Sequence, residues 1–143
     1  MTAVSHVLIS LEAHHAENIL SGVKRVEFRR RSMNIEPGSV VWMYVKVPVG
    51  AIVGCATVKG VHHLPPAALW KRFSKVSGLT KTDLFEYLAG STQTIAIELV
   101  DAMRLADPIQ LDALRDLVDG FHPPQFFSYL PSGSPIRNAV IGR

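Results

Sequence analysis

Four basic side chains and one acidic side chain stand within nine residues of the sequence GVKRVEFRR, residues 22–30. Guanidinium groups present forked donors that match the oxygens of phosphates and carboxylates, and a neighbouring carboxylate can orient them. On a strand, Arg25, Glu27 and Arg29 share one face and the two apolar residues between them share the other. The stretch is therefore either a surface ladder of ion pairs, worth roughly 0 to 1 kcal/mol per pair, or an anion-binding site. The residues alone favour the ladder.

A second candidate site follows on the predicted strand at residues 39–47, where Trp42, Tyr44 and Lys46 alternate. Flat aromatic surface beside positive charge suits stacking on nucleobases and neutralising phosphates. The alternative is an amphipathic strand that packs its aromatic side chains under a helix. Lys24 stands two residues after Gly22, at a predicted turn, where it either reaches into a cleft or is simply solvated.

The six histidines do not form a recognisable metal motif. His14 and His15 are adjacent, so a helix turns them to different sides, and His62 and His63 fall in a predicted loop. Cys55 is the single cysteine, so no internal disulfide is possible, and we read it as a buried, inert thiol in a reducing compartment. The sequence also lacks a nucleophile elbow, a phosphate-binding glycine loop and a dinucleotide fingerprint. We expect no metal and no cofactor.

Short β-branched segments alternate with segments of helical spacing along the chain. A strand at 4–11 precedes a helix at 13–21 that ends at Gly22, and from residue 23 the apolar period changes to two. We predict further strands at 39–47, 51–61 and 92–100, and helices from Pro65 to Gly78, from Thr80 to Gly90 and from Asp107 to Gly120. The tail from residue 121 to 135 is aromatic and predicted to be irregular.

These elements predict an α+β fold: a small curved sheet or β-barrel of about five to six strands with surrounding helices, in a single domain over residues 1–143. A doubly wound parallel sheet fits less well, because the block from 23 to 61 has no crossover helix. A hydrophobic content of 48% and a net charge of +3 fit a folded protein without proving that it binds nucleic acid. With no long apolar run, we expect a cytoplasmic protein without a membrane partner.

The segment ILSGVKRVEFRRR, followed by GSVVWMYVKVPVGAIVGCATV, resembles the ASCH domain family of the PUA-like superfamily. The family signature is a short helix ending in Gly, then Lys, Glu and Arg, which here are Gly22, Lys24, Glu27 and Arg29. Later blocks resemble the elaborated bacterial members, so the likeness covers nearly the whole chain. The resemblance implies a small β-barrel with a cleft near the signature for RNA or a nucleotide.

The resemblance also implies a possible reaction, since some members are described as nucleases and others as amide hydrolases of modified nucleosides. The amide hydrolases carry Thr where this chain has Glu27, and they match it at Lys24. That departure counts against an amidase mechanism here. With the resemblance, a cleft becomes the favoured interpretation of Glu27 and Arg29.

Two hypotheses from different classes follow. In the favoured one the protein binds single-stranded RNA or a nucleotide-like ligand: Lys24, Arg29 and Lys46 contact phosphate, and Tyr44 and Tyr129 stack on bases. Glu27 then orients Arg29 or accepts a hydrogen bond from a base edge.

In the alternative, the protein is a hydrolase that cleaves RNA or a modified nucleoside. Lys24 acts as the base or as an electrostatic stabiliser, Glu27 as its acid or base partner, and Ser128 or Tyr87 stands nearby. A third possibility concerns the aromatic tail around Phe126, which either binds a protein partner or seals one end of the core.

Overall fold

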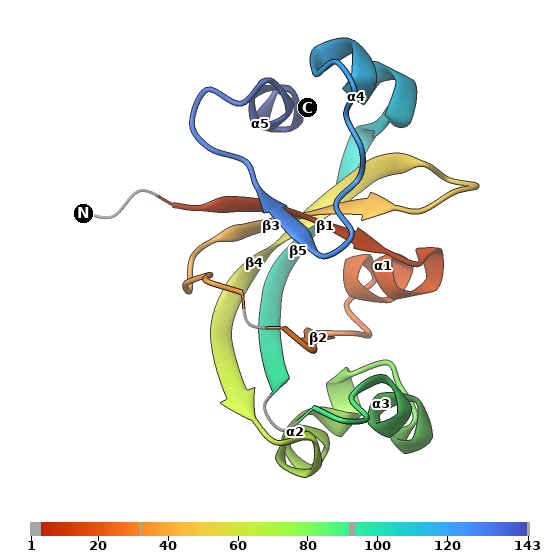
Figure 1. Cartoon of the computed structure of the whole chain (residues 1–143), viewed down its shortest axis with the longest axis vertical. Helices are drawn as coiled ribbons and strands as arrows, with labels where there is room; N and C mark the ends of the chain where they lie inside the picture. The colour runs from red at the N-terminus through yellow and green to blue at the C-terminus, as the bar shows by residue number, and fades with distance from the viewer. Residues whose placement is uncertain (1–3, 32, 92–93, 143) are drawn as a thin grey trace.

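One six-stranded sheet, curled into a half-barrel, organises the chain in a computed structural model that describes residues 4–31, 33–91 and 94–142 (Figure 1). The strand order is β2-β5-β4-β3-β1-β6, which confirms the predicted α+β class with a curved sheet. The strands are β1 (His6–Leu11), β2 (Val26–Arg29), β3 (Val40–Val45), β4 (Ala51–Leu64), β5 (Thr94–Gln110) and β6 (Phe127–Tyr129). Residues 92 and 93, which open the predicted fifth strand, lie outside the described residues.

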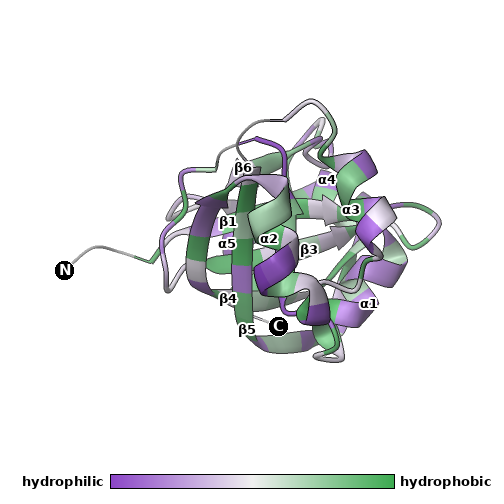
Figure 2. Ribbon diagram, turned by 90° about the horizontal axis from the view of Figure 1, so that it is seen from below, coloured by the Kyte–Doolittle hydropathy of each residue, from purple (hydrophilic) through white to green (hydrophobic). Residues whose placement is uncertain are grey.

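Among the described residues, α2 and α3 lie at one end of the sheet, α4 and α5 lie at the other, and α1 lies beside the middle (Figure 1). They are α1 (Ala13–Leu20), α2 (Pro66–Phe73), α3 (Lys81–Tyr87), α4 (Leu111–Leu117) and α5 (Pro135–Ile141), with a 3-10 turn at Ser74–Val76. Figure 2 shows hydrophilic residues on the outward sides of α1 and α2. No helix among the described residues is long and apolar enough to span a membrane.

The pairing of β1 with β3 is parallel, and the other pairings are antiparallel. Because β1 and β3 are buried on both faces, their alternate residues enter two separate cores. Val7 and Met43 pack with α1, whereas Leu8 and Trp42 pack with α4 and α5. A third core joins β2 to α2 and α3. The three cores place helices around the sheet without closing it.

Curvature comes mainly from the long hairpin of β4 and β5, which have 14 and 17 residues. Their pairing shifts register at three places, and each shift bends the ladder and increases its twist. Gly54 lies at the first shift, where an added Cβ would collide with the main-chain oxygen of Met103. Glycine inside a strand typically marks such a bulge or close approach of two backbones.

Local signals set the end of α1 and the start of α3. Gly22, just past α1, has φ +86°, a left-handed conformation that glycine adopts without strain. Thr80 and Asp83 form a reciprocal capping box at the start of α3.

The C-terminal third differs from its prediction. Asp107 and Pro108 do not begin a helix, because β5 continues through them to Gln110 and α4 starts at Leu111. The tail also contains β6 and α5, neither of which we predicted. β6 exists because it pairs with β1, more than 100 residues away, so the local sequence carries little signal for it.

Candidate functional site

A cleft of about 870 Å³ occupies the opening of the half-barrel, between edge strand β2 and the β1–β6 edge. The helices α1 and α3 and the segment before β6 complete its walls. Five Lys and Arg side chains line it against three carboxylates, so the cleft is electropositive. Its lining includes Ser10, Glu12, His14, His15, Lys24, Glu27, Arg29, Arg30, Arg31, Lys46, Asp83, Tyr87, Gln125, Phe126 and Phe127.

β2 divides its side chains between core and cleft. Val26 and Phe28 are buried against α2 and α3, while Glu27 and Arg29 line the cleft. The side chains divide in this way because apolar and charged residues alternate along β2, and successive side chains of a strand point to opposite faces. The antiparallel pairing of β2 with β5 holds the strand in this orientation. Arg25, which the sequence pattern placed on the same charged face, is exposed and does not line the cleft.

Lys24 is almost completely buried, with 1% of its side chain exposed. The turn after α1 directs it inward, where its main-chain N–H donates to the carbonyl of Asn18 at 2.9 Å. Its Nζ donates to the carbonyl of Ser77 at 2.8 Å and lies 3.7 Å from Oε1 of Glu27. Burial lowers the pKa of Lys24, the positive charge of Arg29 adds to that effect, and the Glu27 carboxylate opposes it. The predicted turn lysine is thus a buried cation.

Glu27 is shared between two cations, because its second oxygen, Oε2, lies 3.1 Å from a guanidinium nitrogen of Arg29. Arg29 also donates to the carbonyl of Phe126 at 3.3 Å and to the carbonyl of Ser10 at 3.5 Å. It therefore links β2 to the opposite edge of the sheet across the opening. Its Nε is buried and has no hydrogen-bond partner among the described residues. The arrangement leaves a guanidinium donor unsatisfied in the cleft.

His15 also lines the cleft, although the sequence analysis assigned it no role. Burial lowers its pKa, and so does the charge of Lys24, whereas Glu27 raises it. Its Nδ1 is buried and lacks a hydrogen-bond partner in the described part of the chain. A signal for this position did exist, since His15 precedes the buried Ile19 by one helical turn and so shares its face.

The other predicted site residues divide between the cleft and the rest of the molecule. Lys46 and Tyr87 line the cleft. Tyr44 is 2% exposed and packs in the core beneath α4 and α5. Ser128 lies in β6 opposite Leu8, outside the cleft lining.

Tyr129 is likewise outside the cleft lining and donates its hydroxyl to the carbonyl of Asn34 at 2.6 Å. Phe127 packs partly against the core, and Phe126 remains 41% exposed.

Groups of three or more His, Cys, Asp or Glu side chains that could hold a metal ion do not occur in the described ranges. Cys55 is half-buried, and burial raises the pKa of its thiol, which keeps it in the unreactive protonated form near neutral pH.

Residues 9–109 match the ASCH domain family, and this range includes Gly22, Lys24, Glu27 and Arg29. The chain belongs to the ASCH domain family. A relative from Zymomonas mobilis, described as an ASCH domain-containing ribonuclease, is 32% identical over 123 residues, which cover 86% of this chain and 82% of the relative. The ASCH fold thus carries the signature at an open edge of its sheet.

Solved structures agree with this assignment. The crystal structure of ASCH from Zymomonas mobilis superposes with a TM-score of 0.87 and 29% identity, covering 94% of this chain and 93% of that one. The N-terminal domain of Staphylothermus marinus McrB superposes with a TM-score of 0.62 over 99% of this chain and 96% of its own, at 10% identity. At that identity the second likeness shows the fold alone.

Proposed function

We propose that this ASCH protein cleaves RNA in its cleft, with Lys24 and Glu27 at the reacting centre. The observation that carries the proposal is the row of Lys24, Glu27 and Arg29 at the base of an electropositive cleft. The similarity to a protein described as a ribonuclease supports it. A buried lysine whose pKa is lowered, lying beside other charged groups in a cleft, is typical of catalytic sites.

The reaction most compatible with these groups is transfer of a phosphodiester to the neighbouring 2′-hydroxyl. Glu27 accepts the proton of that hydroxyl, the 2′ oxygen forms a bond to phosphorus, and the bond from phosphorus to the 5′ oxygen breaks. The 5′ oxygen takes a proton from water, since exposed residues such as His14 and Arg31 leave the cleft open to solvent. The products are a 2′,3′-cyclic phosphate and a free 5′-hydroxyl.

Arg29 and Lys24 provide positive charge where the phosphate gains negative charge. The Nε of Arg29 has no partner within the described residues, and we propose that it donates a hydrogen bond to a phosphate oxygen of the substrate. Lys24 acts from the base of the cleft, where low exposure reduces solvent screening of its charge. His15, whose pKa is lowered, stays neutral near pH 7 and does not compete with these cations for Glu27.

Incubation of the purified protein with a labelled single-stranded RNA tests the proposal. We expect cleavage to products ending in a cyclic phosphate, and no cleavage where the scissile nucleotide lacks its 2′-hydroxyl. Lys24→Met should reduce the rate by on the order of 100-fold. Lys59→Met is the matched control, because Lys59 pairs with Glu98 outside the cleft. Absence of turnover, with and without added divalent metal, would overturn the proposal.

Binding without cleavage is the second candidate, and the burial of Lys24 favours it. The ammonium group of Lys24, held by Ser77 and Glu27, can stabilise a network of ion pairs without contacting a substrate. An acylated nucleoside included in the same assay tests the amide hydrolase reaction. RNA that is bound but not consumed, together with an intact nucleoside, would favour the binding function.

A further inference from the structure

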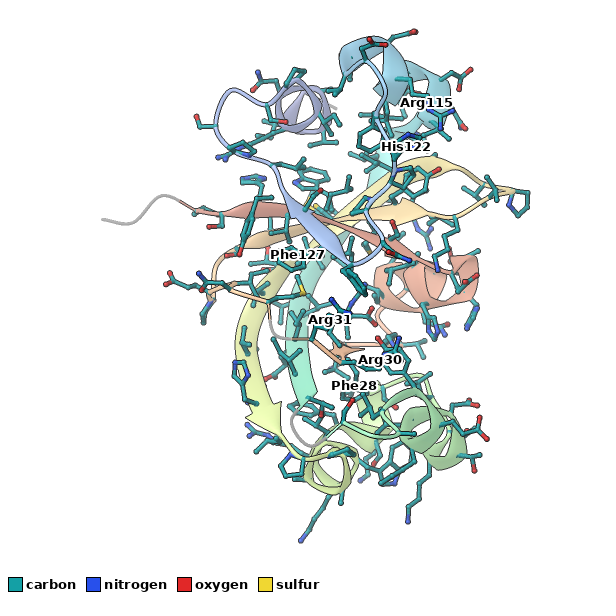
Figure 3. All side chains as sticks on the ribbon, viewed as in Figure 1. Phe28, Arg30, Arg31, Arg115, His122 and Phe127 are labelled. Carbon is teal, nitrogen blue, oxygen red and sulfur yellow. The ribbon has the colours of Figure 1, made fainter. Side chains whose placement is uncertain are left out.

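Arg30 and Arg31 directly follow β2, and the signature motif does not include them. The sequence indicates solvated charges at both positions. In the structure both line the cleft, and each stacks on an aromatic ring. Figure 3 shows the two arginines between the segment that leads into β6 and the helices α2 and α3.

The two stacks lie on different walls of the cleft. The guanidinium of Arg30 lies 5.1 Å from the ring centre of Tyr87, at the end of α3. The guanidinium of Arg31 lies 4.2 Å from the ring centre of Phe126, in the segment before β6. The short stretch directly after β2 thus supplies one guanidinium to each of the two walls.

Both rings are unusually accessible for large aromatic side chains, since Tyr87 is 39% exposed and Phe126 is 41% exposed. Neither arginine forms an ion pair within the described part of the chain, in contrast to Arg29 and Lys46. Flat apolar rings beside uncompensated guanidinium groups are the chemistry that receives an unstacked nucleobase. A duplex keeps its bases stacked inside, so its bases do not reach such surfaces.

We propose that the Arg30–Tyr87 and Arg31–Phe126 stacks are two nucleobase subsites, which make a single-stranded RNA segment the ligand of this cleft. The bases on either side of one phosphodiester occupy the two walls, and that phosphodiester lies at Arg29 between them. The inference rests on the proposed function for the identity of the ligand as RNA. It does not require that the bound strand be cleaved.

Other aromatic contacts in the chain provide matched controls. Arg72 stacks on Phe73 at 5.2 Å, but Phe73 is buried and neither residue lines the cleft. Phe85 lies on α3 like Tyr87, yet it stands outside the cleft lining, under Lys81. Substitutions at Arg72, on α2, and at Phe85, on α3, therefore perturb the same kind of contact without touching the cleft.

Fluorescence anisotropy with a 2′-O-methylated single strand, which blocks attack by the 2′-hydroxyl, measures binding without cleavage. We expect Tyr87→Ala and Phe126→Ala each to weaken binding by roughly 5- to 30-fold, while Phe85→Ala has no effect. Tyr87→Phe should retain affinity, because it keeps the ring. Against an abasic strand of the same length, Tyr87→Ala should bind as the unsubstituted protein does.

The arginines are tested by salt dependence. Arg30→Ala should weaken binding and reduce the slope of log affinity against log salt by roughly 1, whereas Arg72→Ala should leave the slope unchanged. If Tyr87→Ala and Phe126→Ala bound the normal strand as tightly as the unsubstituted protein does, the subsites would be overturned. They would also be overturned if these variants lost as much affinity for the abasic strand or for a duplex as they lose for the normal strand.

These outcomes separate the subsites from the reaction. Ring-dependent binding without turnover of unmodified RNA would retain the subsites and remove the ribonuclease function. Turnover that does not change when both rings are removed would retain the ribonuclease function and remove the subsites.

Discussion

β2 and β3 carry similar alternating patterns but meet different surroundings. On β2, Glu27 and Arg29 alternate with apolar residues and line the cleft. On β3, Trp42 and Tyr44 alternate in the same way and are buried beneath α4 and α5. We call Glu27 and Arg29 the β2 stripe, and Trp42 and Tyr44 the β3 stripe. Considered alone, the residue types of either stripe would suit a binding surface. The difference is that β2 is an edge strand beside an opening, whereas β3 lies inside the sheet with helices on its far side.

Position in the sheet also explains the chemistry of the two stripes. On β3, the buried Trp42 satisfies its polar atom internally, since it donates its indole N–H to Nδ1 of His6 at 3.0 Å. The cleft stripe keeps an unsatisfied donor at Arg29. Unsatisfied polar groups at an opening indicate a ligand site, while satisfied groups in a core indicate stability.

Truncation of the β3 stripe should have the largest effect, and it should act on stability. Trp42→Ala removes a side chain that is 6% exposed and leaves a cavity, so we expect the free energy of unfolding to fall by roughly 3–5 kcal/mol. Urea denaturation measures the loss. Trp70→Ala, on the partly exposed surface of α2, is the matched control with a smaller loss. Equal losses at the two positions would remove the distinction between core and surface.

Neutralising the β2 stripe should act mainly on function. Glu27→Gln leaves Lys24 and Arg29 without their shared carboxylate, and we expect RNA cleavage to slow by on the order of 100-fold. Initial rates with labelled RNA provide the measurement. Glu98→Gln is the control, because Glu98 pairs with His62 outside the cleft. Unchanged turnover in Glu27→Gln would remove Glu27 from the reacting centre.

Acidification should weaken the cleft end of the fold through His15. Its pKa in the folded protein is below the ordinary value of 6.5, so the unfolded chain binds a proton more readily as the pH falls. The contribution of His15 to the free energy of unfolding is therefore fully present above about pH 6.5 and is lost as the pH falls toward the folded pKa. We expect this loss to be less than about 1 kcal/mol, because solvent screens the partly exposed ring. The charges of Lys24, Glu27, Glu12 and His14 act on the same ring.

Thermal melts at pH 7.5 and 5.5 measure this dependence. His15→Gln should narrow the difference between the two melting temperatures, and His63→Gln, at an exposed position, should not. Part of the dependence will remain, because burial also lowers the pKa of His6. An unchanged difference in His15→Gln would contradict the assignment.

The smallest effect is expected at Lys46, where the β3 stripe ends and the chain reaches the cleft. Lys46 pairs with Glu12 at 3.3 Å, and both side chains are more than half exposed, so Lys46→Met should change stability by less than about 0.5 kcal/mol. RNA affinity should fall by a few-fold and the salt slope by roughly 1. A salt slope equal to that of the unsubstituted protein would place Lys46 outside the ligand path.

Much of the site was predictable because its signals are local. The glycine stop of α1, the period of two in β2 and the capping box of α3 each depend on residues a few positions apart. The resemblance to ASCH then pointed to Lys24, Glu27 and Arg29 as a group.

The missed features share a dependence on distant partners. β6 and the extension of β5 through Pro108 are formed by pairing with other strands, and α5 covers a core assembled by β1 and β3. The roles of Arg30 and Arg31 depend on rings brought from α3 and from the tail.

By itself, the sequence determined which residues share a face, where α1 stops and that the chain is an ASCH domain, because periodicity, capping and family motifs are written in neighbouring residues. Only the tertiary structure decided that Arg25 stays outside the cleft, that Lys24 is buried and that Tyr44 belongs to a core. Burial depends on which elements pack against a face, and those elements come from distant parts of the chain.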